Sequence, residues 1–304
     1  MGLQSFFGKA LSHFNRKSIK RETLRSIIDS EQENSGVVNI HRYDPSNIGD
    51  FYCGPHHYFP QLKDKYLDIF DYKRENTEQR AHFISTVVAN SLIIGGGGLL
   101  NREGFNLQLD AFAELSRKGK KTVLWGVGHN AKERSTFGKS LNYNIDTEKF
   151  GLVGVRDYGR KELWVPCVSC LHPTFQQTDA VVNELGVIFH KKTLKNKKLT
   201  AKFDGIPSTS NDSDFDEVVR FIKQTDTIVT DSYHAMYWSI LLEKKVLVIP
   251  NSSKFYDFKY KPVITNFESF KTDLNKANRY TGVLAECCEV NTHFGEKVFD
   301  YLNL

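Results

Sequence analysis

The chain repeats one pattern along most of its length: a short run of apolar and β-branched residues, a glycine-rich or polar loop, and then an amphipathic stretch. The apolar runs begin at Val37, Ser91, Thr122, Gly151, Gly186, Thr227 and Val246. Residues 107–118 and 214–223 show the spacing of three and four that is typical of amphipathic helices. Strands that alternate with helices form mainly parallel sheets covered by helices. We therefore expect an α/β fold.

The pattern is lost over residues 171–179 and resumes afterwards, which divides the chain. Its 304 residues are enough for two α/β domains of ordinary size. We predict a basic segment at residues 1–30, followed by two Rossmann-like domains at 31–175 and 176–304. In open parallel sheets, ligands bind beyond the carboxyl ends of the strands. The residues just after each apolar run are therefore the candidates for a site.

The basic segment has the spacing of an amphipathic helix. Up to Arg25 its lysines and arginines face a single acid, Glu22, and its apolar side chains recur at intervals of three and four: they are Leu3, Phe6, Phe7, Leu11 and Phe14. Two alternatives stay open, since residues 1–26 can contact an anionic membrane surface or the helix can pack on the protein's own body. No nucleic-acid-binding motif accompanies the charge, so no nucleic-acid partner is expected.

The compartment follows from the hydropathy and the cysteines. The apolar runs are far shorter than a membrane-spanning helix, and the N-terminus lacks the apolar core of a secretory signal. The 5 cysteines are odd in number, and the C-x-x-C of Cys167 and Cys170 has no second pair to complete a zinc site. We expect a cytoplasmic protein, peripheral at the inner membrane face under the first alternative above, with reduced, buried thiols and no metal.

Glycines follow the run at residue 91 and are suited to a ligand. A backbone without side chains lets an anion or a sugar approach closely, and the candidates are Gly96, Gly97 and Gly98. Neither the dinucleotide fingerprint nor the P-loop is present, which disfavours nicotinamide and ATP chemistry. Other polar residues that follow predicted strands are Asn47 and Asp50, His129 and Asn130, and Arg156. Arg156 can hold a phosphate or carboxylate bidentately, and a structural ion pair with Asp157 is the alternative.

The stretch at residues 227–250 carries the strongest signal. A buried strand leads into Asp231 and Ser232, and His234 falls in the first turn of an apolar helix. The amides and dipole of that helix favour an anion beside the imidazole, which is also suited to proton transfer. A histidine with a purely structural role is the alternative reading.

In their order and spacing, NIGD, GGGGLL, GVGHN, VRDYGR and TDSYHAMYWSILLEKKVLVIP resemble the serial motifs of the polysaccharide pyruvyltransferase family. The resemblance implies a GT-B-like fold and transfer of the pyruvyl group of phosphoenolpyruvate onto two hydroxyls of a hexose, which gives a cyclic ketal. It implies a lipid-linked precursor of capsule or exopolysaccharide as acceptor. Phosphoenolpyruvate is then a co-substrate, and no organic cofactor is expected.

The resemblance also implies roles for the candidates. His234 would be the principal acid and base, with Asp231 or Asp50 as its partner and Ser232 as an orienting group. Some relatives carry an arginine two residues before the histidine, where this chain has Ser232. The donor must then be held by another cation, for which Arg156 is the first candidate. The further donor-binding candidates are Lys191, Lys254 and the glycine amides.

Two rival functions stay open. A GT-B glycosyltransferase that uses a nucleotide-sugar would share the fold and the cationic site. A non-catalytic sugar-binding protein would share the fold without turnover.

Overall fold

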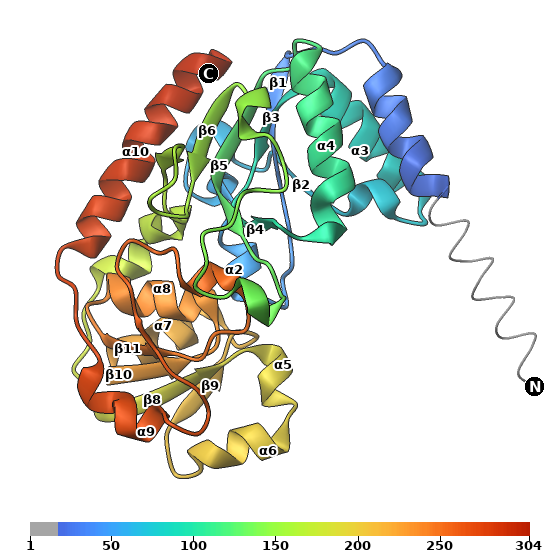
Figure 1. Ribbon diagram of the computed structural model, residues 1–304. Coiled ribbons are helices and arrows are strands. Elements are labelled where there is room, and N and C mark those ends of the chain that lie inside the picture. Colours follow the sequence, from blue (N-terminus) through green and yellow to red (C-terminus); the bar gives the residue numbers. More distant parts are fainter. Residues whose placement is uncertain (1–17) are drawn as a thin grey trace, which may run out of the picture.

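The computed structural model describes residues 18–304, which form two parallel sheets, each flanked by helices (Figure 1). This confirms the expected α/β class with two Rossmann-like halves. Within the described part of the chain, no helix has both the length and the hydropathy needed to cross a bilayer.

The first sheet has the strand order β2-β1-β3-β5-β6-β7, with β4 paired to β5, and all of its pairs are parallel. Its strands are β1 (Gly36–His41), β2 (Tyr66–Asp68), β3 (Asn90–Ile94), β4 (Gly97–Leu100), β5 (Thr122–His129), β6 (Leu152–Val155) and β7 (Leu163–Trp164). Successive side chains of a strand point to opposite faces of the sheet, and both faces of this sheet are buried. In β3, Ile94 packs with the α3 and α4 side and Ile93 with the opposite side.

The helices of the first half include α2 (Ile48–Phe51), α3 (Thr77–Ala89) and α4 (Glu103–Arg117). The side chain of Asn76 caps α3 by accepting hydrogen bonds from two amides of its first turn. Phe83 and Phe112 pack from α3 and α4 onto one face of the sheet. Helices α3 and α4 therefore cover one side of the sheet.

The second sheet has the order β12-β11-β10-β8-β9, again with parallel pairs. Its strands are β8 (Asn183–Phe189), β9 (Ser208–Ser210), β10 (Thr225–Thr230), β11 (Lys245–Val248) and β12 (Val263–Ile264). The helices of this half are α5 (Lys191–Leu194), α6 (Lys197–Thr200), α7 (Phe215–Lys223), α8 (Tyr233–Leu241) and α9 (Phe270–Asp273). Every residue of α8 is buried, which explains its apolar sequence.

The last helix, α10 (Val283–Leu302), returns to the first half and runs along it (Figure 1). Its residues Phe294 and Val298 pack with Val123 and Trp125 of β5 on the sheet face opposite to α3 and α4. The expected division at residue 175 falls between β7 and β8. The second segment thus supplies a covering helix to the first sheet.

Residues 18–29 are helical and pack on the first half, where Leu24 and Ile27 are buried in its core. Residues 18–29 therefore pack on the protein's own body, which was one of the two alternatives for the basic segment. The predicted apolar stripe from Leu3 to Phe14 lies outside the described residues, so the membrane alternative stays a prediction.

Three segments differ from what their sequence predicts. The glycine-rich residues 97–100 form strand β4 instead of a loop, because they pair with β5. The pattern of residues 158–163 predicts a helix after Arg156, but the chain turns at Gly159, where φ is +79°. The lysine-rich residues 191–202 predict an exposed irregular loop, but they form the short helices α5 and α6.

Candidate functional site

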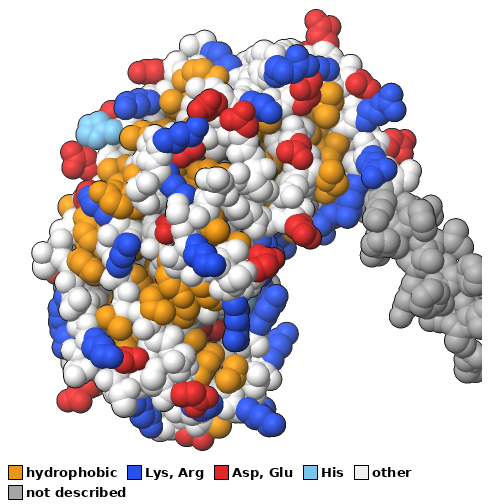
Figure 2. All heavy atoms as spheres, viewed as in Figure 1, with side chains coloured by type: hydrophobic (Ala, Val, Ile, Leu, Met, Phe, Trp, Pro, Cys, Tyr) orange, Lys and Arg blue, Asp and Glu red, His pale blue; other side chains and the backbone are white. Residues whose placement is uncertain are grey.

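The carboxyl ends of the two sheets meet at a cavity of about 190 Å³, which we call the Arg156 pocket. The first half contributes Asp50, Arg102, Asn130, Arg156 and the glycines at 96–98, and the second half contributes His234 and Lys254. In Figure 2, Lys and Arg side chains gather beside the hollow between the two halves. The pocket is thus assembled from both halves and is rich in cations.

Arg156 follows β6 and is only 1% exposed. Its guanidinium carbon lies 4.2 Å from the ring centroid of Tyr233, the first residue of α8. Among the described residues, nothing accepts a hydrogen bond from its Nε or Nη2. A buried guanidinium with two unused donors is costly unless an acceptor binds there, and a carboxylate or phosphate matches its fork.

Two glycines make the space that Arg156 occupies. A Cβ at Gly98 would come within 3.0 Å of Nη2 of Arg156, and a Cβ at Gly128 within 2.7 Å of its Nε. The amide of Gly96 donates to the carbonyl of Cys53, 3.0 Å away, so it is not free to bind an anion as the sequence led us to expect. The absence of a side chain at Gly98 and Gly128 therefore leaves the space that the Arg156 side chain fills.

Lys254 is another cation of the pocket, and it lies near Asp50. It lies in the short 3-10 helix η9 (Ser253–Phe255), with Nζ 5.6 Å from the ring centroid of Tyr233. Burial, together with repulsion from Lys132 and Arg156, lowers the pKa of Lys254 to about 7. The side chain can therefore exchange a proton near neutral pH.

His234 lies at the second position of α8, with Nε2 3.6 Å from the Sγ of Cys167. A Cβ at Gly49 would come within 2.1 Å of its Nδ1, so only glycine fits there. Burial, together with repulsion from Arg156 and Lys254, places the pKa of His234 well below 6.5. The imidazole is thus neutral at pH 7, and it can accept a hydrogen bond but is poorly suited to carry a proton during the reaction.

Asp50 supplies the carboxylate of the pocket. Its Oδ2 accepts a hydrogen bond of 2.6 Å from Nδ2 of Asn47, whose Oδ1 in turn accepts one of 2.9 Å from Nδ2 of Asn211 in the second half. Burial raises the pKa of Asp50, and the nearby Lys254 opposes the shift. Asn47 therefore lies behind Asp50 and orients it.

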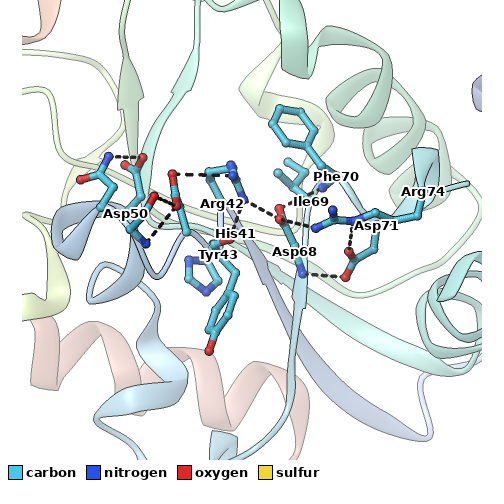
Figure 3. A network of polar contacts seen from close by, with 12 residues as sticks. His41, Arg42, Tyr43, Asp50, Asp68, Ile69, Phe70, Asp71 and Arg74 are labelled. Atoms are coloured by element: carbon cyan, nitrogen blue, oxygen red, sulfur yellow. Dashed lines mark hydrogen bonds and ion pairs between the residues drawn. The ribbon is translucent and has the colours of Figure 1, made fainter. Parts of the chain in front are cut away.

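Figure 3 shows Arg42 between Asp50 and Asp68. Its Nη1 lies 2.5 Å from Oδ2 of Asp68, and its Nη2 lies 3.7 Å from Asp44. Arg42 lines the Arg156 pocket with its charge already paired.

Besides Asn47, several predicted residues do not line the pocket. Asp231 accepts a 2.6 Å hydrogen bond from the amide of His190 and another from the hydroxyl of Thr193, so it fixes the start of α5 instead of pairing with His234. Ser232 is buried at the start of α8 without a side-chain hydrogen bond to the helix amides. Lys191 pairs with Asp44 at 3.2 Å. Lys191 thus joins the two halves.

His129 also lies outside the pocket, although the sequence placed it in the cleft. It is 1% exposed, with Nδ1 2.6 Å from the Oγ of Ser253 and Nε2 2.9 Å from Asp257. Arg160 pairs with the same Asp257 oxygen at 2.6 Å. His129 therefore fastens the segment that carries Lys254 to the end of β5.

Replacing His129 should loosen this connection. We expect His129→Phe to lower the free energy of unfolding by about 1–3 kcal/mol, because it removes two hydrogen bonds of a buried side chain, one to Ser253 and one to Asp257. Urea titration measures this change. His293→Phe, on the exposed surface of α10, is the matched control and should leave stability nearly unchanged. Equal stability of the two variants would show that His129 does not hold this segment.

The lining residues that were not expected from the sequence include Arg42, Cys53, Phe70 and Arg102. Arg42 directly follows β1, so the rule that identified Arg156 applies to it. Phe70 and Arg102 each stand two residues after a strand, β2 and β4, that the apolar runs did not predict. Cys53 follows no strand, and only the folded chain brings it to the pocket.

The chemistry that this pocket can support is proton transfer beside a bound anion. Its cations are suited to an anion, Lys254 can give a proton, and the carboxylate of Asp50 can accept one. No three His, Cys, Asp or Glu side chains gather in a metal-binding arrangement within residues 18–304.

Comparison with known proteins agrees with the resemblance noted from the motifs. One similar solved structure is an uncharacterized protein from Klebsiella pneumoniae, at 15% identity and a TM-score of 0.41, with 88% of this chain and 99% of that chain covered. No curated protein matches the chain. The model of the polysaccharide pyruvyl transferase family matches residues 37–253, which include every residue of the pocket named above except Lys254. Since this match spans well over half of the sequence, the chain belongs to the polysaccharide pyruvyl transferase family.

Proposed function

We propose that this protein transfers the pyruvyl group of phosphoenolpyruvate onto two hydroxyls of a hexose and forms a cyclic ketal. The observation that carries the proposal is the buried guanidinium of Arg156, which has two unused donors inside a pocket built by both halves. Phosphoenolpyruvate offers a carboxylate and a phosphate, which are the partners that such a group requires.

The donor would be held by the cations of the Arg156 pocket. Arg156 binds one anionic group bidentately, and Arg102 and Lys254 lie on the same cavity for the other. The low dielectric of a half-closed pocket strengthens these interactions relative to water. Binding in this manner orients carbon 2 of the enol toward an acceptor.

The first chemical step adds a proton to carbon 3 of the enol. We assign this proton to Lys254 instead of His234, because the pKa of Lys254 is about 7 whereas that of His234 lies well below 6.5. Protonation turns carbon 3 into a methyl group and makes carbon 2 electrophilic. The ammonium form of Lys254 is thus the reactive one.

The later steps remove protons from the two acceptor hydroxyls. The first hydroxyl attacks carbon 2 and gives its proton to Asp50, and the phosphate then leaves with the pair of electrons of its bond to carbon 2. The second hydroxyl attacks the same carbon and closes the ketal. One of the two released protons goes to the departing phosphate and the other restores Lys254, which balances the reaction.

We also propose that the acceptor is a lipid-linked precursor of capsule or exopolysaccharide, met at the inner face of the cytoplasmic membrane. Family membership supports a polysaccharide pathway. Lys20, Arg21 and Arg25 on the helical residues 18–29 are suited to anionic lipid headgroups.

The activity is tested by incubating the protein with phosphoenolpyruvate and a panel of free and lipid-linked hexoses. We expect release of inorganic phosphate that depends on the acceptor, together with the mass of one pyruvate ketal on the sugar. Release of UDP or GDP from a nucleotide-sugar, without phosphate from phosphoenolpyruvate, would instead identify a glycosyltransferase.

A further inference from the structure

A second cavity adjoins the Arg156 pocket in the first half. It has a volume of about 480 Å³ and is lined by Lys20, Arg42, Asp68, Phe70, Lys73 and Arg74, among others. We call it the Asp68 cavity. Arg42 and Phe70 line both cavities, so they form a shared wall. Its volume lies within the range of roughly 300–1,000 Å³ that small-molecule sites usually have.

The two arginines of the Asp68 cavity are paired, unlike Arg156. Asp68 is 6% exposed and accepts from Arg42 at 2.5 Å, while Arg74 lies 3.6 Å from Asp68 and 3.1 Å from Asp71 (Figure 3). The ammonium of Lys73 lies over the ring of Phe70, with Nζ 3.3 Å from the ring centroid. The paired carboxylate and guanidinium groups present fixed donors and acceptors in the cavity wall.

These fixed groups match a neutral polyol. One oxygen of Asp68 accepts from the amide of Phe70 at 3.1 Å, which holds the carboxylate in place and leaves lone pairs for a hydroxyl. The guanidinium of Arg74 is half exposed and can donate to another hydroxyl. Phe70 stacks on Phe105 with ring centroids 5.0 Å apart, which keeps the shared wall rigid.

We propose that the Asp68 cavity binds the saccharide acceptor through its hydroxyls, with Asp68 and Arg74 as the recognising groups. The inference rests on the proposed function, because an acceptor must present two hydroxyls to the donor across a short distance. A sugar in this cavity meets the donor at the wall formed by Arg42 and Phe70. The site also lies beyond the carboxyl end of β2, where ligands of parallel sheets bind.

The first test measures sugar binding without turnover. Saturation-transfer NMR is recorded on the full protein with methyl glycosides of glucose, galactose and mannose as probes. We expect at least one glycoside to bind, and Asp68→Asn and Arg74→Gln each to weaken it by about tenfold or more, since each removes a hydrogen bond to a charged group. Arg74 is half exposed, so its variant keeps the test valid even if Asp68→Asn fails to fold.

Asp226→Asn is the matched control, because Asp226 is also a partly buried carboxylate that pairs with two cations, Lys245 and Arg279. It lies on β10, outside both cavities. This variant should bind the glycoside as the original protein does. Absence of binding to the original protein, or equal binding by all four proteins, would overturn the assignment.

The second test separates this inference from the proposed function. With the acceptor found active in the transfer assay, both cavity variants should raise the KM for the acceptor about tenfold or more and leave the KM for phosphoenolpyruvate unchanged. Transfer with an unchanged acceptor KM would refute the Asp68 cavity and leave the proposed function intact. Glycoside binding that depends on Asp68, in a protein that transfers no pyruvyl group, would refute the proposed function alone.

Discussion

Replacing Arg156 by methionine is expected to lower kcat/KM for phosphoenolpyruvate by at least about a hundredfold, or roughly 2.7 kcal/mol of transition-state stabilisation. The physical reason is the pair of donors on Arg156 that no described residue uses. Arg156→Lys should restore little of the activity, because an ammonium has neither the planar fork nor the stacking on Tyr233. Phosphate release measured against donor concentration gives these values.

The stability of Arg156→Met distinguishes a donor-binding role of Arg156 from a structural role. A guanidinium that is 1% exposed and lacks an acidic partner in the described chain costs solvation free energy. Arg156→Met should therefore unfold at the same temperature as the original protein or at a higher one, while activity is lost. Arg279→Met, at an exposed ion pair, is the control and should keep full activity. A variant at Arg156 that is both active and less stable would identify a structural residue and contradict the assignment.

The second large effect concerns Lys254 and pH. Because the pKa of Lys254 is lowered from 10.5 to about 7, its ammonium form is present below pH 7 and is lost as the pH rises through that value. If Lys254 donates the proton to carbon 3, kcat/KM should fall about tenfold per pH unit above pH 7. Lys254→Met should lower kcat by about 10²–10⁴-fold and remove this alkaline decline. The pH profiles of the two proteins test both statements.

Lys244→Met provides the control for Lys254. Burial also lowers the pKa of Lys244, but its Nζ donates to the carbonyl of Lys223, away from the Arg156 pocket. Its pH profile should match that of the original protein. If Lys254→Met kept the alkaline decline, the proton would have to come from another group.

The main strands were predictable because their signal is local. A run of apolar residues such as 91–94 or 227–230 reflects burial on both faces of a parallel sheet, whatever the strand order. The position of Arg156 after β6 was predictable for the same reason, since strands of a parallel sheet present their following residues at one edge. The turn at Gly159 was missed because its local pattern also fits a helix.

The hydrogen bonds and the pKa of each candidate side chain depend on partners that are remote in sequence. Asp231 and Arg156 both follow predicted strands, yet Asp231 is occupied by His190 and Thr193 whereas Arg156 has two unused donors. His129 was expected in the cleft because it follows a strand, but it is bound to Ser253, which lies 124 positions away in the sequence. The pKa of Lys254 likewise depends on cations contributed by the other half.

The sequence by itself determined the α/β class, the main strands and the edge at which the candidate pocket lies, because hydrophobic periodicity and the residue that follows a strand are local properties of a chain. Only the tertiary structure decided which charges at that edge are paired. Lys191 is neutralised by Asp44 across 147 positions, while the repulsion from Lys132 and Arg156 lowers the pKa of Lys254 in spite of the attraction to Asp50. Electrostatic free energy depends on distance in space and on burial, and neither can be read from neighbouring residues.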